Sequence, residues 1–260
     1  MNRIPDYITL TCDIVALMCK YCNDNKIESL VVGVSGGIDS AVSSTLAAKT
    51  GLPTYVVGMP IKQNDAQETL SDAHMYWLEK NYKNVTVLKA DLSDVFGKFT
   101  ETIGKECGME YVINKMACAN TRSRLRMVTL YQIAASVNGI VVGTGNKVED
   151  YGVGFYTKYG DGGVDIAPIA DLYKTEVREL GRTFGVIPEI IDAKPTDGLW
   201  DDGRTDEDQI GASYEDLEYA MEHGTGPAVR VLHDFHCKNK HKMNPIPTYK
   251  LEVKKECVSA

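Results

Sequence analysis

The sequence lacks any long apolar run. No stretch approaches the roughly 20 residues that a membrane-spanning helix needs. Asp6 and Asp13 interrupt the opening segment, where a secretory signal would be continuous and apolar. We therefore expect no membrane partner. The seven cysteines are an odd number, and a chain of 260 residues is too long to depend on disulfide bonds, so reduced thiols and a cytoplasmic location are expected.

Basic residues are also scarce relative to acidic ones. The chain has 28 Lys and Arg against 36 Asp and Glu, a net charge of −8. A general nucleic-acid binder needs a dominant positive field to meet phosphates, so we expect no nucleic-acid partner. A local basic pocket for one phosphorylated ligand is still compatible with this balance. At 43% hydrophobic and 25% charged residues, the composition excludes collagen-like, low-complexity and wholly disordered chains.

What the chain does have is a regular alternation of strand and helix patterns. Short β-branched runs alternate with segments whose apolar residues recur at helical spacing. Such alternation specifies βαβ units, so we predict an α/β fold with an open parallel sheet and helices on both faces. The expected strands span 30–34, 54–58, 85–88 and 139–143, and the expected helices span 14–22, 38–49, 65–81, 117–137 and 174–184.

The character of the chain changes after the fourth expected strand. Residues 144–170 are rich in Gly, aromatic and polar residues and are expected to form a long functional loop. The stretch 197–209 is strongly acidic and is interpreted as either a solvated linker or a lid, with two short helices and a Lys-rich tail after it. We predict one domain over 1–260, with a core at about 25–150 and a C-terminal elaboration at about 151–260.

A loop rich in glycine and serine joins the first expected strand to the first helix of the sheet. Its glycines let the backbone approach an anion, and the first amides of the following helix point at that anion. Asp39 would repel a bare phosphate, so its natural partner is a phosphate-bound Mg²⁺. The loop matches neither a Walker A motif nor a G-x-G-x-x-G fingerprint, and a capped tight turn without a ligand is the alternative. The candidate phosphate-binding residues are Gly33, Val34, Ser35, Gly36, Gly37, Ile38, Asp39 and Ser40.

The pattern Ser-Gly-Gly-x-Asp-Ser in this loop resembles that of the ATP pyrophosphatases, which share the adenine nucleotide α-hydrolase-like fold. This superfamily cleaves ATP between its α- and β-phosphates and releases AMP and pyrophosphate. It includes the synthetases of NAD⁺, GMP, asparagine and argininosuccinate, as well as tRNA-thiolating enzymes. The loop alone does not choose among these branches.

Further segments of the sequence distinguish among these branches. In order and spacing they are similar to the ammonia-dependent NAD⁺ synthetases over residues 5–245. The resemblance implies ATP-dependent amidation of deamido-NAD⁺ to NAD⁺ by ammonia, through an acyl adenylate and with release of AMP and pyrophosphate, the last step of NAD⁺ biosynthesis. It also implies a homodimer. The segments are 120–127 (NTRSRLRM), 143–150 (GTGNKVED), 155–168 (FYTKYGDGGVDIAP), 171–175 (DLYKT) and 194–196 (KPT).

The resemblance also assigns the ATP end of the site. Asp39 and Glu149 follow two different strands, so both are expected at one edge of the sheet, where they can hold Mg²⁺ between them. Lys174 matches the family lysine that meets the ATP phosphates, and Thr144 and Thr196 match its ATP-contacting threonines. Asp39, Glu149 and Lys174 are therefore the predicted catalytic residues. Taken singly, a solvated lysine and ordinary turn threonines are the alternatives.

At the dinucleotide end, the resemblance selects five residues for binding deamido-NAD⁺. Within the long helix, Arg122 and Arg126 share a face by their i,i+4 spacing, so a third arginine between them points elsewhere and is preferred through the resemblance alone. Tyr156 and Tyr159 are expected either to stack on nicotinate or to pack beneath the loop. Met243 stands where the family has an arginine. The five residues are Arg124, Lys158, Asp165, His241 and Lys242.

Other functions stay open on the sequence alone. A tRNA-thiolating enzyme would use Cys19-x-x-Cys22, although a buried helical stripe also accounts for these cysteines. A catalytically inert ATP-binding regulator would have no need of the Asp39 and Glu149 carboxylates. A separate glutaminase partner that delivers ammonia is compatible with the sequence, whereas the length leaves no room for a built-in glutaminase domain.

Overall fold

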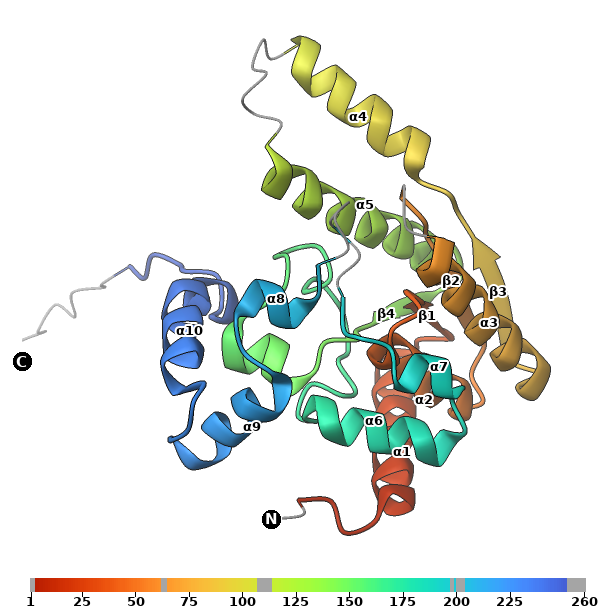
Figure 1. Cartoon of the computed structure of the whole chain (residues 1–260). Coiled ribbons are helices and arrows are strands. Elements are labelled where there is room, and N and C mark those ends of the chain that lie inside the picture. The colour runs from red at the N-terminus through yellow and green to blue at the C-terminus, as the bar shows by residue number, and fades with distance from the viewer. Residues whose placement is uncertain (1–2, 62–64, 107–113, 197–198, 200–203, 252–260) are drawn as a thin grey trace, which may run out of the picture.

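A four-stranded parallel sheet organises the first half of this computed structural model (Figure 1). The structure describes residues 3–61, 65–106, 114–196, 199 and 204–251. The sheet has the order β3-β2-β1-β4, and its neighbouring strands all pair in parallel. The predicted fold class is confirmed, and so are the four expected strands. The strands are β1 (Ser29–Gly33), β2 (Thr54–Gly58), β3 (Val85–Lys89) and β4 (Gly139–Val142).

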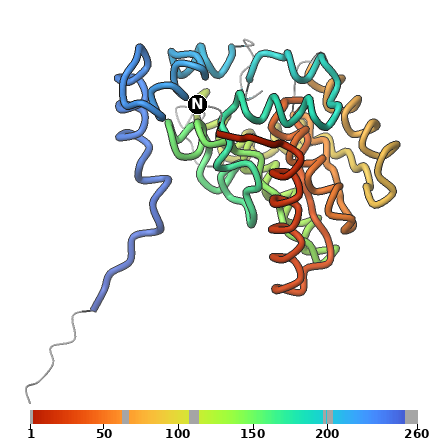
Figure 2. Tube along the Cα trace, turned by 90° about the horizontal axis from the view of Figure 1, so that it is seen from below, coloured from red at the N-terminus to blue at the C-terminus, as the bar shows by residue number. Residues whose placement is uncertain are grey.

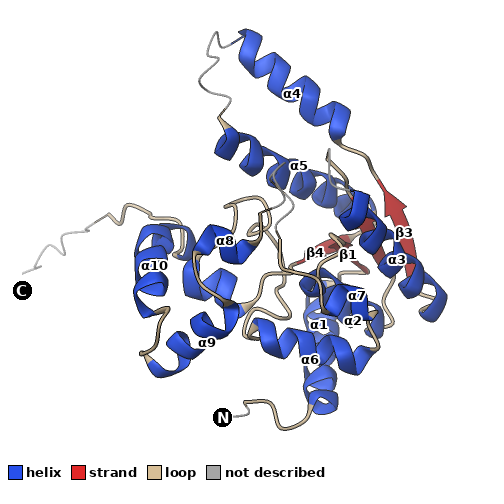
Figure 3. Ribbon diagram, viewed as in Figure 1, coloured by secondary structure: helices blue, strands red, loops and turns tan. Residues whose placement is uncertain are grey.

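The central strands are apolar on both faces because helices cover both. Leu30 and Val32 pack on one face with three helices, α1 (Tyr7–Asn25), α2 (Ile38–Lys49) and α6 (Lys174–Phe184). Val31 and Val141 point to the other face and pack with α4 (Ser93–Glu106) and α5 (Lys115–Ser136). Figure 3 shows α2 and α5 on opposite sides of the strands. Alternate residues of one strand therefore anchor two separate helical layers.

Most helices lie where the apolar spacing predicts them. The bounds of α2 and α6, and of α3 (Asp65–Asn81), coincide with the expected ranges, while α5 begins two residues early. Helix α1 is longer than expected and is preceded by its N-cap Asp6, whose carboxylate accepts the Ile8 and Thr9 amides at 3.0 and 3.1 Å. A side-chain cap of this kind fixes where the helix starts. Within the described residues, no helix has the length and apolar composition to cross a membrane.

The cysteine pair of α1 is partly a packing feature. The buried stripe of the helix consists of Ile14, Met18 and Cys22, and Cys19 is half-buried, with its thiol 3.7 Å from the Thr50 carbonyl. Cys12, which the helical spacing would also place on this stripe, is exposed and does not belong to it. The five cysteines within the described residues, Cys12, Cys19, Cys22, Cys118 and Cys237, are free thiols.

The C-terminal half is more helical than the sequence suggests. The expected loop 144–170 contains a π-helix, η2 (Val148–Val153), and α4 and α7 (Pro188–Ile191) were not expected. The end of the acidic stretch forms α8 (Asp206–Ile210). Two helices follow the stretch as expected, α9 (Tyr214–His223) and α10 (Val229–Met243), although α10, at 15 residues, is not short. Part of the expected lid, residues 197–198 and 200–203, lies outside the described residues. After α10 the chain runs away from the body (Figure 2).

The strand order determines where a ligand can bind. From β1 the chain adds β2 and then β3 on one side, and it later returns to place β4 on the other side of β1. The connections therefore diverge between β1 and β4 and leave a crevice at the carboxyl ends of these two strands. The predicted phosphate loop follows β1, and the segment with Thr144 and Glu149 follows β4.

Candidate active site

A cavity of about 290 Å³ opens at the carboxyl ends of β1 and β4. The residues that end or follow these strands, Gly33 and Gly143, both line it. All eight residues of the predicted phosphate loop line it as well: Gly33, Val34, Ser35, Gly36, Gly37, Ile38, Asp39 and Ser40. The structure therefore gathers this loop at the crevice where the strand order reverses.

Gly36 is the residue that shapes the loop. Its φ of +88° lies in the left-handed region. A Cβ at this position would lie 2.6 Å from the carbonyl oxygen of Gln67 and 3.0 Å from the amide nitrogen of Ser71, both on α3. At Gly37 the nearest atom to an added Cβ is Ser35 Oγ, at an ordinary 3.5 Å. Glycine is therefore required at position 36 by both conformation and space, but not at position 37.

The two serine hydroxyls brace the loop. Ser40 Oγ donates to the Gly37 carbonyl at 2.9 Å and accepts the Ser35 amide at 3.1 Å. The Gly37 amide donates to Ser35 Oγ at 3.3 Å. Gly37 is also the N-cap of α2, and no side chain in the described part of the chain caps this helix. The first amides of α2 therefore face the cavity, where they can donate to an anion.

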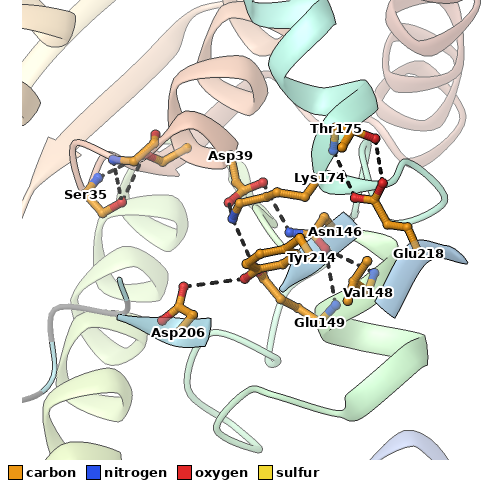
Figure 4. Close-up of polar contacts among 12 residues, drawn as sticks. Ser35, Asp39, Asn146, Val148, Glu149, Lys174, Thr175, Asp206, Tyr214 and Glu218 are labelled. Atoms are coloured by element: carbon orange, nitrogen blue, oxygen red, sulfur yellow. Dashed lines mark hydrogen bonds and ion pairs between the residues drawn. The ribbon is translucent and has the colours of Figure 1, made fainter. Parts of the chain in front are cut away.

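Lys174, the first residue of α6, joins the two predicted metal-binding carboxylates (Figure 4). Its Nζ donates to Asp39 Oδ2 at 2.5 Å and to Glu149 Oε1 at 3.0 Å. The lysine side chain is 3% exposed and each carboxylate 16%. Burial alone would lower the pKa of Lys174, but the charges of Asp39 and Glu149 raise it above its ordinary value. A permanently charged ammonium thus lies between two carboxylates, and the three predicted catalytic residues meet.

The donor set here suits Mg²⁺. This ion takes oxygen ligands, and it is commonly held by one or two carboxylates together with water and substrate phosphates. Asp39 and Glu149 provide two carboxylates close enough to share one ammonium. Among the residues that the structure describes, no group of three or more His, Cys, Asp or Glu is arranged to hold a metal. A cation held by this pair would complete its coordination with oxygen ligands of another kind, such as water or substrate phosphates.

Asn146 is a residue of this site that sequence reasoning missed. It is fully buried. Its Nδ2 donates to Asp39 Oδ1 at 3.3 Å, and its Oδ1 accepts the Val148 and Glu149 amides at 3.1 and 3.2 Å. One side chain therefore orients Asp39 and caps the π-helix that carries Glu149. An Asn just before a helix is a capping signal, and it could have been recognised as one.

Tyr214 was missed for a different reason. It is fully buried at the start of α9, and its hydroxyl donates to Glu149 Oε1 at 2.6 Å. Its ring centroid lies 4.8 Å from Lys174 Nζ. Tyr214 stands 65 residues after Glu149 and belongs to no recognisable motif. The contact follows from how the C-terminal helices pack, which no local pattern encodes.

The two predicted ATP-contacting threonines both line the cavity. Thr144 follows β4, and Thr196 lies after α7. The Thr196 hydroxyl donates to the Arg204 carbonyl at 3.3 Å. The structure brings both threonines to the same cavity as the phosphate loop, as the prediction requires.

The three arginines of α5 divide as their spacing predicts. Arg126 lines the cavity and its Nε donates to the Met59 carbonyl at 3.0 Å. Arg122 is buried and donates to the Leu199 carbonyl at 2.6 Å. Arg124 is exposed, lies outside the described lining of the cavity, and donates to the Lys158 carbonyl at 3.1 Å. Arg126, on the face opposite to the arginine that the resemblance prefers, is thus the α5 arginine nearest a ligand in the cavity.

The other predicted dinucleotide-binding residues are not part of the described lining of the cavity. Lys158 Nζ lies 5.4 Å from the centroid of the Tyr159 ring. Asp165 accepts the Val141 amide at 2.8 Å and the Tyr131 hydroxyl at 3.0 Å. These two contacts tie Asp165 to β4 and α5.

The two C-terminal members of that set differ from each other. Lys242 donates to the Gly154 and Tyr156 carbonyls at 2.6 and 2.7 Å, and burial lowers its pKa. His241 is exposed at the end of α10. Of the two tyrosines, Tyr156 lines the cavity and Tyr159 is exposed. Lys242 therefore holds the segment from which Tyr156 reaches the cavity.

Two carboxylates of the family-like motif segments, Asp150 and Asp161, also line the cavity and were not predicted. Burial, followed by the charges of Glu149, Asp161 and Asp39, raises the pKa of Asp150 to about 7. Asp161 accepts the Ser123 hydroxyl at 2.6 Å and the Thr157 amide at 3.0 Å, and burial raises its pKa. Asp150 and Asp161 lie within the motifs 143–150 and 155–168, and this position in the sequence could have identified them as site residues.

Comparison with known proteins gives a consistent result across nearly the whole chain. The profile of the NAD synthase family matches residues 10–242. An NH(3)-dependent NAD(+) synthetase of Carboxydothermus hydrogenoformans is 39% identical over 219 residues, which are 83% of this chain and 86% of that protein. One from Alkaliphilus metalliredigens is 37% identical over 242 residues, 90% of this chain and 96% of the relative.

Solved structures extend the comparison. The NMN synthetase from Francisella tularensis has a TM-score of 0.84 at 31% identity, over 95% of this chain and 99% of that one. An NH3-dependent NAD synthetase from Campylobacter jejuni has a TM-score of 0.73 at 22% identity, over 94% and 100% of the two chains. At that identity the second likeness concerns the fold alone. The matched regions include the sheet, the phosphate loop and the segments that carry Glu149 and Lys174.

Proposed function

This chain belongs to the NAD synthase family, and on that premise we propose that it amidates deamido-NAD⁺ to NAD⁺ with ATP and ammonia. One observation carries the proposal: Asp39, Glu149 and Lys174 converge beside the phosphate loop, in the crevice between β1 and β4. This is an arrangement for handling a polyphosphate. It contains no nucleophile–base pair, and the proposed reaction requires none.

The proposed reaction has two steps. An oxygen of the nicotinate carboxylate attacks the α-phosphorus of ATP, and the bond from that phosphorus to the bridging oxygen breaks, so that pyrophosphate leaves with the electron pair. The nitrogen of ammonia then attacks the acyl carbon. The bond from that carbon to the AMP oxygen breaks, the nitrogen loses a proton to solvent, and the amide and AMP are released. The protein must align two polyanions and offset charge on phosphate oxygens.

The chain's own residues supply those two functions. The loop 33–40 and the first amides of α2 receive phosphate oxygens. Lys174 is buried and charged, so its ammonium acts on a nearby phosphate in a setting where water screens little. Asp39 and Glu149 would hold Mg²⁺, which neutralises phosphate charge when it is bound. Thr144 and Thr196 lie in the same cavity and are assigned to ATP.

The dinucleotide acid is assigned to the region around the cavity mouth. Arg124 and Lys158, joined by a hydrogen bond, are its proposed contacts, together with Asp165, His241 and Lys242. The support for Arg124 is its neighbour Ser123, which lines the cavity one residue earlier. Arg126 is added to this set because it faces the cavity directly.

The molecular setting is also part of the proposal. We infer a homodimer in which α5 contributes to the interface, because this helix exposes Met116 and Val128 by 56% and 66%. Light scattering would measure the assembly. We infer a cytoplasmic location, in keeping with five free cysteines among the described residues. A single functional unit over 1–260 is inferred because residues of the C-terminal elaboration, among them Lys174 and Thr196, line the same cavity as the phosphate loop of the core.

A second candidate substrate is nicotinate mononucleotide. It is favoured by the likeness to the NMN synthetase from Francisella tularensis, which has a TM-score of 0.84 at 31% identity. The replacement of a family arginine by Met243 removes one positive charge from the end of the site assigned to the dinucleotide. The chemistry at the carboxylate would be the same for both substrates, and only the binding of the distal nucleotide would differ.

The test is a product assay with both acids. Purified protein is incubated with ATP, Mg²⁺ and ammonium, and with either deamido-NAD⁺ or nicotinate mononucleotide, and kcat/KM is measured for each. The proposal expects NAD⁺, AMP and pyrophosphate, with deamido-NAD⁺ the better substrate. A higher kcat/KM for the mononucleotide would establish the second candidate. Formation of ADP, or no turnover with either acid, would overturn both. An arm with glutamine in place of ammonium detects any need for a separate glutaminase.

A further inference from the structure

Tyr214 contacts two catalytic side chains at once, and the reaction steps above do not use it. Its hydroxyl donates to Glu149 Oε1 at 2.6 Å, and its ring lies under the Lys174 ammonium, 4.8 Å from Nζ to the ring centroid. Figure 4 shows the tyrosine beside these two groups, with a longer contact of 3.5 Å from its hydroxyl to Asp206. It is fully buried, so neither contact competes with water. A hydrogen bond to a charged group in such a setting is among the stronger ones in proteins.

The hydrogen bond from Tyr214 uses Oε1 of the Glu149 carboxylate and leaves Oε2 for other partners. A tyrosine hydroxyl carries one proton to donate, and the carboxylate of Glu149, at 2.6 Å, is a much nearer acceptor than that of Asp206, at 3.5 Å. Tyr214 and Lys174 both bond to Oε1. Neither contact uses Oε2, and Glu149 lines the cavity. A carboxylate fixed through one oxygen presents the other in a defined direction.

A second contact from α9, the helix that carries Tyr214, is made with the segment that carries Lys174. Glu218 lies four residues after Tyr214, on the same face of α9. Its carboxylate accepts the Thr175 amide at 3.0 Å and the Thr175 hydroxyl at 2.6 Å. Thr175 follows Lys174 in the first turn of α6, where an anion also interacts favourably with the helix dipole. Helix α9 therefore holds Glu149 and the start of the lysine-bearing helix together.

Packing makes this arrangement rigid. Tyr214 and Leu217 of α9 share a buried cluster with Val148 and Val153, which begin and end the π-helix that carries Glu149. Tyr173, the residue before Lys174, belongs to the same cluster. The backbone around each catalytic group is thus fixed against the helix that carries Tyr214. Close packing of this kind transmits small displacements.

We propose that Tyr214 is a positioning residue that fixes Glu149 for divalent-cation binding, with Glu218 anchoring the helix from which it acts. The inference rests on the proposed function in one respect, that the cation is the one accompanying ATP. Mutation of a group that orients a metal ligand in this way typically lowers metal affinity by about 10- to 100-fold.

The test measures cation binding without turnover. Mn²⁺ is titrated into the full-length protein with α,β-methylene-ATP, and free Mn²⁺ is followed by electron paramagnetic resonance. Tyr214→Phe keeps the buried ring and removes only the hydroxyl, and it is expected to weaken Mn²⁺ binding about tenfold. Tyr131→Phe, which removes a hydroxyl bonded to a different carboxylate, Asp165, is the matched control and is expected to leave Mn²⁺ affinity unchanged.

Two further measurements separate positioning from a general structural effect. In a Glu149→Gln background, Tyr214→Phe is expected to cause no further loss of Mn²⁺ affinity, because the hydroxyl acts through that carboxylate. In the activity assay, the Mg²⁺ concentration for half-maximal rate is expected to rise about tenfold, while kcat at saturating Mg²⁺ stays close to wild type.

Each outcome of these measurements either supports or contradicts the inference. If Tyr214→Phe does not fold, Glu218→Gln takes its place, with an expected weakening of about threefold from the loosened helix. Wild-type Mn²⁺ affinity in the folded variant, an equal loss in the Glu149→Gln background, or no protein-bound Mn²⁺ in the wild type would overturn the inference. Failure of the proposed function is seen separately, as an absence of amide product while the Mn²⁺ results hold.

Discussion

Replacing Gly36 by alanine should damage the site far more than replacing its neighbour Gly37. A residue other than glycine in the left-handed region costs about 1–2 kcal/mol, and Gly36 has a φ of +88°. The added Cβ would also lie 2.6 Å from the Gln67 carbonyl oxygen and 3.0 Å from the Ser71 nitrogen. Both are backbone atoms, so the loop or α3 must move, at a further cost of about 1–2 kcal/mol. We expect Gly36→Ala to lose about 3 kcal/mol of unfolding free energy.

Gly37→Ala is the matched control. Gly37 has an ordinary φ of −91°, and its added Cβ would meet its nearest neighbour at 3.5 Å. Its cost is expected to stay within about 1 kcal/mol. Urea unfolding of both variants gives the two free energies, and calorimetric titration with α,β-methylene-ATP gives the nucleotide affinity. We expect affinity to fall at least about tenfold in Gly36→Ala only. Equal losses of stability and affinity in the two variants would refute the reasoning.

Three further outcomes are expected. Burial lowers the pKa of His74 to about 4, so the folded state resists its protonation, and the stability present above pH 6.5 is lost as the pH falls toward 4. The free energies of unfolding measured with urea at pH 5 and pH 8 should differ by about 2 kcal/mol because of His74, and His74→Gln should remove that difference. Lys174→Met should destabilise the protein by about 3 kcal/mol, because two partly buried carboxylates lose their cation, and Asp39→Asn in the same chain should restore part of the loss in thermal unfolding. Arg126→Ala should raise KM for the acid substrate more than Arg124→Ala does, since Arg126 alone of the two lines the cavity, and the reverse order in steady-state kinetics would favour the resemblance-based assignment.

The sheet and most of its helices could be predicted because their signals are local. Runs such as 30–34 and 54–58 are short, apolar and β-branched, and each is followed by a helix whose apolar residues repeat at regular spacing. Parallel strands bring their carboxyl ends to one edge, so Asp39 and Glu149 could be placed together without knowing the strand order. Two of the three predicted catalytic residues were within reach for this reason. Lys174 itself was found through a family motif and not through periodicity.

The remainder depended on long-range packing. The π-helix 148–153 lies in a segment whose Gly and aromatic content is typical of a loop, and Asn146 stabilises its start through its buried side chain. Tyr214 reaches Glu149 only because α9 packs on that π-helix. The face of α5 that meets the cavity was set by tertiary packing, which placed Arg126 inward and Arg124 outward. Spacing could separate the arginines but could not say which face is which.

The fate of the carboxylate oxygens tests the central claim most directly. Deamido-NAD⁺ carrying ¹⁸O in both oxygens of its nicotinate carboxylate is incubated with the protein, ATP and ammonium. The ¹⁸O content of AMP and NAD⁺ is then measured by mass spectrometry. Attack of the carboxylate on the α-phosphorus leaves one ¹⁸O in AMP and one in the amide of NAD⁺. The account predicts that distribution. Unlabelled AMP, or ¹⁸O in inorganic phosphate released together with ADP, would contradict it.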